Sequence, residues 1–221
     1  MQCVKLVILC LMPTIMFSSC ANKARQAIDS VQYSAWETFG VEKRDLFKRK
    51  ISNVKDDQED TGKAFKDALT KLKEVYAFDG GNLEREYNKL NSSYEEAQEE
   101  SAEVSESITE LNEVAEDLFV EWEGELQDIK TADLKRKSAK QLSETRSKYK
   151  TLHQHLKTSE NKMAPVLARL KDQVLFLKHN LNAKAIGGLK TEGDKIENDI
   201  ESLLEDMNKS TKEAEAFIET L

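Results

Sequence analysis

Residues 83–122 read LEREYNKLNSSYEEAQEESAEVSESITELNEVAEDLFVEW, where apolar or small side chains recur at alternating steps of four and three. These positions are Leu83, Tyr87, Leu90, Tyr94, Ala97, Ser101, Val104, Ile108, Leu111, Ala115, Leu118 and Trp122. A period of 3.5 residues is the heptad pattern of helices that wind around one another in a left-handed supercoil. The stretch therefore predicts a helix over residues 83–129, a rod roughly 70 Å long at about 1.5 Å per residue.

A second heptad run precedes the first and follows the same rule. Its positions are Phe47, Ile51, Val54, Gln58, Thr61, Phe65, Ala68, Leu72 and Val75. The sequence Asp79-Gly80-Gly81-Asn82 separates the two runs and predicts a turn, with Asn82 as the N-cap of the following helix.

The second half of the chain has shorter apolar runs. We expect a helix that starts at Thr131 or Asp133 and ends near Lys157. Residues 159–165 then predict a corner, because Pro165 suits the first turn of a last helix.

The last helix contains three glycines, Gly187, Gly188 and Gly193, each of which costs roughly 1 kcal/mol inside a helix. They predict a kink or a short break rather than a domain boundary. Before them, residues 173–182 are apolar almost all round, which predicts a buried central helix. Asn180 and Asn182 would then need hydrogen-bond partners.

Charge predicts which helices pair. Residues 90–129 hold fourteen acids and no Lys or Arg, whereas residues 130–157 hold nine basic residues against two acids. Two copies of such an acidic helix repel each other, which disfavours a parallel homodimer through it. We expect it instead between the basic helices of its own chain. The fold class is therefore all-α, an elongated antiparallel helical bundle of long helices.

The N-terminus has the features of an export signal. Lys5 precedes the apolar run of residues 6–17, which is too short to span a bilayer. Phe17-Ser18-Ser19-Cys20 then resembles the bacterial lipobox. This resemblance implies a lipoprotein signal peptide over residues 1–19, fatty acylation of Cys20, and one elongated bundle over residues 20–221. The alternative is plain cleavage and release.

By the sorting habit of enterobacterial lipoproteins, Ala21 after the cysteine favours the outer membrane, on its periplasmic face. All three cysteines lie at or before Cys20, so the mature chain has no intrachain disulfide. A formal charge of −8 argues against a nucleic-acid partner. The membrane, reached through the lipid on Cys20, and an unidentified protein are the expected partners.

A basic segment follows the anchor and could contact anionic lipid headgroups, at roughly 1 kcal/mol per charge near the surface. The alternative is that these residues pair with the acidic helix, which we favour. The residues are Lys43, Arg44, Lys48, Arg49 and Lys50.

Other motifs offer little chemistry. His153 and His155 point about 200° apart on a helix, so they cannot share a metal ion, and His179 stands alone. Residues 188–195 resemble a phosphate-binding loop, but Asp194 replaces the required lysine. In Glu121-Trp122-Glu123 the tryptophan falls on a heptad position, which favours the core over a sugar platform. We expect no enzyme activity, cofactor or metal.

Several stretches resemble one bacterial lipoprotein family, catalogued as domain of unknown function 2959. They are FGVEKRD (39–45), LFVEWE (118–123), PVL (165–167), DQVLFLKHNLNA (172–183) and EAEAFI (213–218). The resemblance covers nearly all of the mature chain and implies no activity, since the family has no established catalytic or binding residues. We expect a structural, scaffolding or protein-binding lipoprotein. The alternative is a membrane-contacting or membrane-shaping bundle that uses the basic segment.

Overall fold

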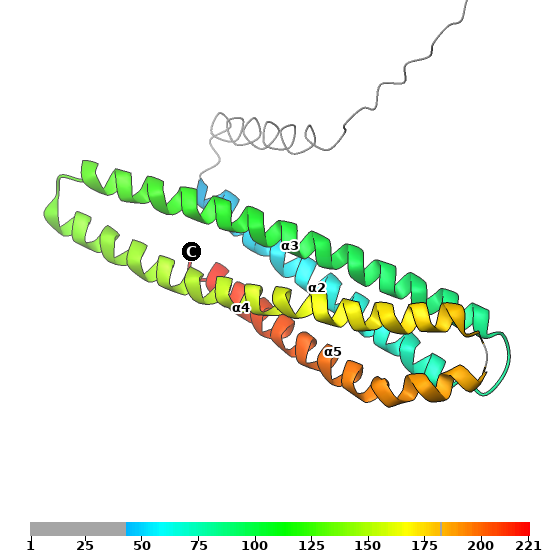
Figure 1. The fold of residues 1–221 in the computed structure, drawn as a ribbon. Helices are drawn as coiled ribbons and strands as arrows, with labels where there is room; N and C mark the ends of the chain where they lie inside the picture. Colours follow the sequence, from blue (N-terminus) through cyan, green and yellow to red (C-terminus); the bar gives the residue numbers. More distant parts are fainter. Residues whose placement is uncertain (1–42, 182) are drawn as a thin grey trace, which may run out of the picture. The chain divides into compact units, whose positions relative to one another are not determined.

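The structure is a computed structural model that describes residues 43–181 and 183–221. These residues form four helices: α2 (Lys43–Tyr76), α3 (Leu83–Asp128), α4 (Ala132–His179) and α5 (Ala183–Ile218). Each helix packs against the next, and α5 returns to pack against α2 (Figure 1). The predicted all-α antiparallel bundle is confirmed. The lipobox and Cys20 lie outside the described residues.

The two heptad runs form the core as predicted. Every heptad position of α2 from Phe47 to Val75 is buried, and so are most of those of α3 from Leu83 to Ala115. Near the end of α3 the buried face turns by one position. Phe119 and Leu126 are buried there, whereas the predicted Leu118 and Trp122 are only half-buried.

The first two predicted turns are present. At the start of α3, the backbone N–H of Arg85 donates to the Asn82 side chain at 3.1 Å, which confirms the N-cap. Gly80 and Gly81 have φ of 153° and 112°, values that L side chains rarely adopt. Thr131 is the N-cap residue of α4, although its side chain makes no capping hydrogen bond.

The predicted corner at residues 159–165 is wrong, because α4 continues through Pro165 to His179. Proline lacks an N–H and leaves one carbonyl of the preceding turn without its helical partner. Burial of Ser159, Met163 and Val166 on both sides of Pro165 holds the helix together there. Tertiary packing thus overrides the local signal.

The corner between the last two helices lies later, at Asn180 and Leu181, inside the segment predicted to be a buried central helix. That prediction is wrong in part: Val174 and Leu177 are buried, but Leu175 and Phe176 are exposed. Asn180 ends α4, and its side-chain amide donates to the Phe176 carbonyl at 2.9 Å. Of the kink or short break predicted at the glycines, the break is wrong, since α5 is continuous across Gly187 and Gly188.

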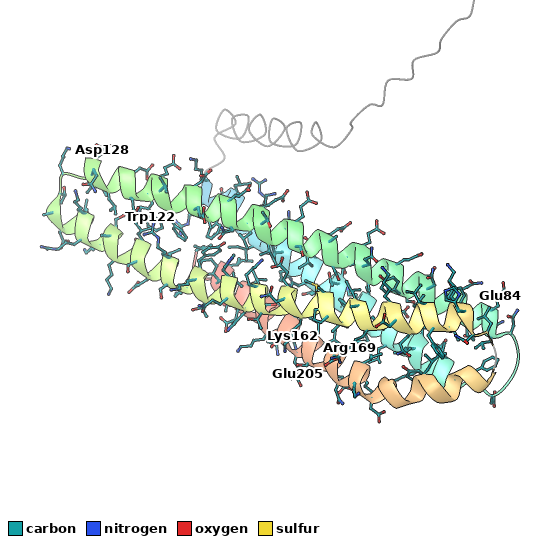
Figure 2. The ribbon with its side chains drawn as sticks, in the orientation of Figure 1. Glu84, Trp122, Asp128, Lys162, Arg169 and Glu205 are labelled. Carbon is teal, nitrogen blue, oxygen red and sulfur yellow. The ribbon has the colours of Figure 1, made fainter. Side chains whose placement is uncertain are left out.

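Opposite charges join the helices along their sides. Lys162 and Arg169 lie on the side of α4 that faces α5, where they pair with Asp206 and Asp199 (Figure 2). The acidic helix α3 packs against both α2 and α4, as its charge predicts. Among the described residues, no helix has a stretch long and apolar enough to cross a lipid bilayer.

Candidate functional site at the end where α2 begins

Four aromatic rings, one from each helix, close the core where α2 begins and α5 ends. Phe47 lies 6.0 Å from Phe119, 5.5 Å from Tyr149 and 5.8 Å from Phe217 between ring centroids. All three contacts are edge-to-face, the geometry that aromatic quadrupoles favour. This aromatic cluster marks the level at which the four-helix core ends.

Tyr149 and His153 bring polar groups into the cluster. Burial, with a smaller effect of Glu116, raises the pKa of the Tyr149 hydroxyl well above its ordinary value. The hydroxyl therefore stays protonated and donates to Asn112 Oδ1 at 3.2 Å. Burial also lowers the pKa of His153, whose Nδ1 is buried without a hydrogen-bond partner among the described residues. The shifts of both pKa values favour the neutral forms of Tyr149 and His153, which suit packing inside the cluster.

The basic segment occupies the first two turns of α2, and its pairing with the acidic helix is visible. Lys43 pairs with Glu121 at 3.0 Å and Lys50 with Glu110 at 2.6 Å. Arg44 and Arg49 are exposed, and Lys48 is half-buried. Partly exposed ion pairs contribute about 0–1 kcal/mol, so they orient α2 against α3 more than they stabilise it.

The helices α3 and α4 extend beyond the start of α2 as a two-helix hairpin (Figure 1). Lys43, the first residue of α2, lies level with Glu121, and the turn of the hairpin follows at residues 129–131. We call residues 119–142 the protruding hairpin. Its two arms, residues 119–128 of α3 and 132–142 of α4, are each about ten residues, or ~15 Å, long.

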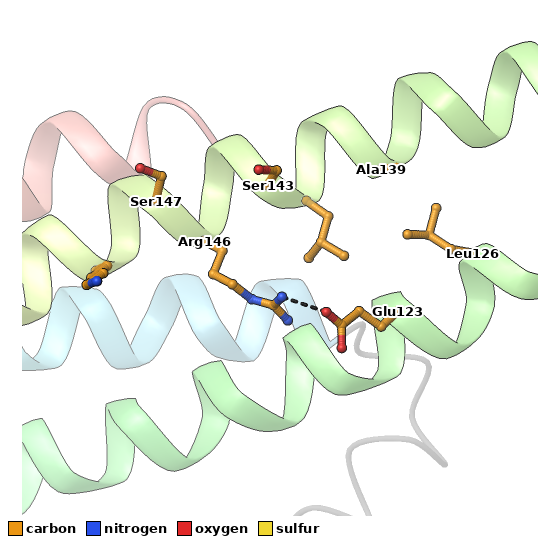
Figure 3. A pocket seen from close by; sticks show the side chains of 8 residues that line it. Glu123, Leu126, Ala139, Ser143, Arg146 and Ser147 are labelled. Carbon is orange, nitrogen blue, oxygen red and sulfur yellow. Dashed lines mark hydrogen bonds and ion pairs between the residues drawn. The ribbon is translucent and has the colours of Figure 1, made fainter.

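An open pocket of about 500 Å³ runs between the two helices of this hairpin (Figure 3). Leu126, Ala139 and Leu142 are the apolar part of its lining, and Glu123 on α3 and Arg146 on α4 are the charged residues described next. Arg146 pairs with Glu123 at 2.6 Å and lies 5.1 Å from the Phe119 ring centroid. The hydrogen bond from Arg146 lowers the pKa of Glu123 and keeps it ionised.

The candidate carboxylates beside Trp122 are therefore committed to other partners. Glu121 pairs with Lys43, and Glu123 pairs with Arg146. Trp122 is half-buried and donates its indole N–H to Ser138 Oγ at 2.9 Å. The arrangement supports packing rather than a carboxylate pair across a cleft.

The histidines and the glycine-rich stretch are not brought together. His155 Nδ1 lies 4.0 Å from Glu213, His153 packs on Tyr149, and His179 is exposed at the end of α4. Residues 188–195 are helical, which is the wrong backbone for a phosphate loop. Within the described ranges, no group of three or more His, Cys, Asp or Glu side chains could hold a metal ion.

The opposite end of the bundle carries an apolar corner that the sequence did not predict. Leu175, Phe176 and Leu181 are 42%, 43% and 44% exposed, and they lie within seven residues at the α4–α5 turn. The segment looked uniformly apolar, so its pattern gave no sign of which side faces water. The end of α4 at Asn180 leaves these three side chains exposed, and the sequence pattern does not show where that helix ends.

Comparison with known proteins gives one match. The family model described as protein of unknown function (DUF2959) matches residues 32–221, which include all four helices. The search of curated proteins found no match.

Proposed function

The chain belongs to the DUF2959 family, and from that premise we propose that it is a non-enzymatic lipoprotein, anchored through Cys20 to the periplasmic face of the outer membrane. Its bundle acts as a spacer that presents a binding surface to another protein. The supporting observation is the exposed apolar corner of Leu175, Phe176 and Leu181. Single exposed apolar side chains are common, but a cluster of them marks an interaction surface.

The corner is well placed for a spacer. It lies at the end of the bundle opposite the first residue of α2 (Figure 1). The helices between these ends bury a core made of residues from all four, so the rod is stiff enough to hold the corner away from Lys43. A rod of 46 residues such as α3 spans ~70 Å.

Two measurements test this proposal. The mass of the N-terminal peptide of the mature protein should show fatty acylation of Cys20, and an unmodified N-terminus would refute the anchor. A photoreactive amino acid in place of Phe176, in the lipidated full chain, should crosslink one protein in intact cells. The same group in place of the exposed Thr151, in the middle of α4, should not. Equal crosslinking at both positions contradicts the binding corner.

The absence of catalysis is tested separately. Turnover of a substrate by the purified mature protein, abolished by one point mutation that leaves the fold intact, would overturn the non-enzymatic proposal.

The alternative function, contact with lipid through the basic segment, is weakened by the pairing of Lys43 and Lys50 with α3. It predicts that a Cys20→Ser form binds anionic liposomes at low salt. Neutral substitutions at all five basic positions, Lys43, Arg44, Lys48, Arg49 and Lys50, would abolish that binding. No binding by the Cys20→Ser form excludes the alternative.

A further inference from the structure

The protruding hairpin differs from the rest of the bundle in the number of helices that cover it. Over most of their length α3 packs against α2 and α4 against α5. Of the four described helices, α3 and α4 alone extend beyond the level of Lys43 and Glu121. Leu126, Ala139 and Leu142 line the open pocket between the two helices of the hairpin. Val120 and Leu134, which are 68% and 56% exposed, also lie in this hairpin.

The two helices of the hairpin carry opposite charges. Residues 113–128 of α3 hold seven acids and no basic residue, while residues 130–150 hold eight basic residues and two acids. Several of these charges are not used within the bundle. Glu125 and Asp128 in the hairpin, and Lys148 and Lys150 just beyond it on α4, have no ion-pair partner in the described part of the chain.

A surface with one acidic and one basic half is complementary to itself after a twofold rotation. In an interface with that symmetry, each contact of residue i with residue j is repeated as j with i. The acidic α3 of one hairpin then lies against the basic α4 of the other, and the pairing of acid with acid is avoided. The apolar pocket between the helices is covered at the same time.

We propose that the protruding hairpin is a self-association surface, through which two copies of this chain pair in antiparallel fashion, α3 against α4. The four helices so brought together continue the four-helix packing that, among the described residues, ends near Lys43. The proposal concerns the bundle alone and does not depend on the lipid anchor.

The size of the surface predicts a weak interaction. The hairpin face measures ~15 Å by ~20 Å, which falls well short of the roughly 1,200–2,000 Å² buried in a stable interface. We expect a dissociation constant between about 10 µM and 1 mM in solution. The association should also weaken as salt is added, because exposed charges are screened.

The first experiment uses sedimentation equilibrium of the mature chain with Cys20→Ser, up to millimolar concentration. We expect a reversible monomer–dimer equilibrium that shifts toward monomer at high salt. A chain that stays monomeric at all concentrations and low salt overturns the proposal.

Charge reversal supplies the decisive comparison. The variant Glu125→Lys with Asp128→Lys places two basic side chains on α3 of the hairpin, and Lys137→Glu with Lys140→Glu places two acidic side chains on α4. For each variant alone the dissociation constant of the dimer should rise at least about tenfold. A mixture of the two variants should form a heterodimer. The matched control, Glu96→Lys with Glu99→Lys, makes the same change in net charge on exposed residues of α3 outside the hairpin and should dimerise as the parent does.

Circular dichroism of each variant checks that it is folded. Dimerisation that survives in both hairpin variants, or that is lost equally in the control, overturns the proposed surface. Failure of the two variants to associate on mixing, when each alone is a folded monomer, contradicts the pairing of α3 with α4.

Discussion

Gln58 is an amide in the middle of an apolar core, and it joins three helices. Its Nε2 donates to Ser159 Oγ on α4 at 3.0 Å, and its Oε1 accepts from Ser210 Oγ on α5 at 3.0 Å. All three residues are buried. The two hydroxyls can also donate to carbonyls of their own helices, Ser159 to Leu156 and Ser210 to Met207, whereas the Gln58 amide has these two serines as its partners in the described chain. A single polar layer of this kind fixes the relative register of helices, because sliding any helix leaves a buried polar group unpaired.

Substitutions of Gln58 test how much this polar layer contributes to the stability of the bundle. Gln58→Ala should lower the free energy of unfolding by about 1–3 kcal/mol, because it removes the shared partner of two buried hydroxyls. Gln58→Leu should cost less, since an apolar side chain fills the space. The exposed Gln154→Ala on α4 is the control and should change stability by less than about 0.5 kcal/mol. Urea denaturation measures all three, and equal effects of Gln58→Ala and Gln154→Ala would contradict the role of this layer.

His153 should make the stability of the bundle depend on pH. Burial, reinforced by Lys157, lowers its pKa from 6.5 in the folded chain, against a smaller opposing effect of Glu160 and Glu116. Above that ordinary value both the folded and unfolded forms are neutral, and His153 has no effect. As pH falls below it, the unfolded chain binds a proton that the folded chain resists, so stability decreases.

The test compares the melting temperature at about pH 7.5 and about pH 5. His153→Gln should show a smaller decrease on acidification than the parent, whereas His179→Gln, at an exposed position, should show the same decrease. An unchanged decrease in His153→Gln would mean that this imidazole titrates normally in the folded bundle.

At the scale of the element, the glycines of α5 differ in their surroundings. A Cβ added at Gly187 would meet no atom within 4 Å, but one added at Gly193 would lie 2.5 Å from Cε2 of Tyr76. The Tyr76 hydroxyl in turn donates to Gln173 at 3.4 Å. The absence of a side chain at Gly193 therefore lets the end of α2 pack closely on α5.

Two alanine substitutions distinguish these glycines. Gly187→Ala should stabilise the protein by about 0.5–1 kcal/mol, because alanine favours the helix and fits the available space. Gly193→Ala gains the same helix propensity but displaces the Tyr76 ring, at a cost of about 1–3 kcal/mol, so the net effect should be destabilising. Thermal unfolding measures both, and equal stabilisation would show that Tyr76 moves aside freely.

Long heptad runs predicted α2 and α3 correctly, and the local signal at Asn82 predicted the N-cap of α3, but the local signals later in the chain were misleading. The core positions of α2 and α3 followed from periodicity, because dozens of residues repeat one pattern. Pro165 and Gly187 were misinterpreted as breaks, since the packing that keeps these helices continuous comes from residues distant in sequence. At the candidate site, charge predicted that α2 pairs with α3, but not which lysine meets which glutamate. The pocket of the protruding hairpin depends on how the side chains of α3 and α4 meet across the turn, which periodicity does not define.

At the scale of the whole molecule, stability should vary along the bundle. The core is made of buried residues from all four described helices, whereas only two of these helices, α3 and α4, form the protruding hairpin. Local opening is easiest where few buried contacts hold the backbone. The backbone amides of residues 119–142 should therefore exchange hydrogen at least about tenfold faster than those of residues 90–111. Hydrogen exchange with mass spectrometry measures this, at a protein concentration low enough to keep the chain monomeric, and uniform protection along α3 would contradict it.

The position of Phe217 beside Phe47, with ring centroids 5.8 Å apart, has a practical consequence for labelling. A fluorescent protein fused after Leu221 would lie at the end of the bundle that contains Phe47. A probe inserted between Gly80 and Gly81 would report from the far end. Energy transfer between the two would measure the length of the rod in living cells, and a short peptide bridge from Leu221 to Lys43 should allow a circularly permuted chain with new ends at Lys130.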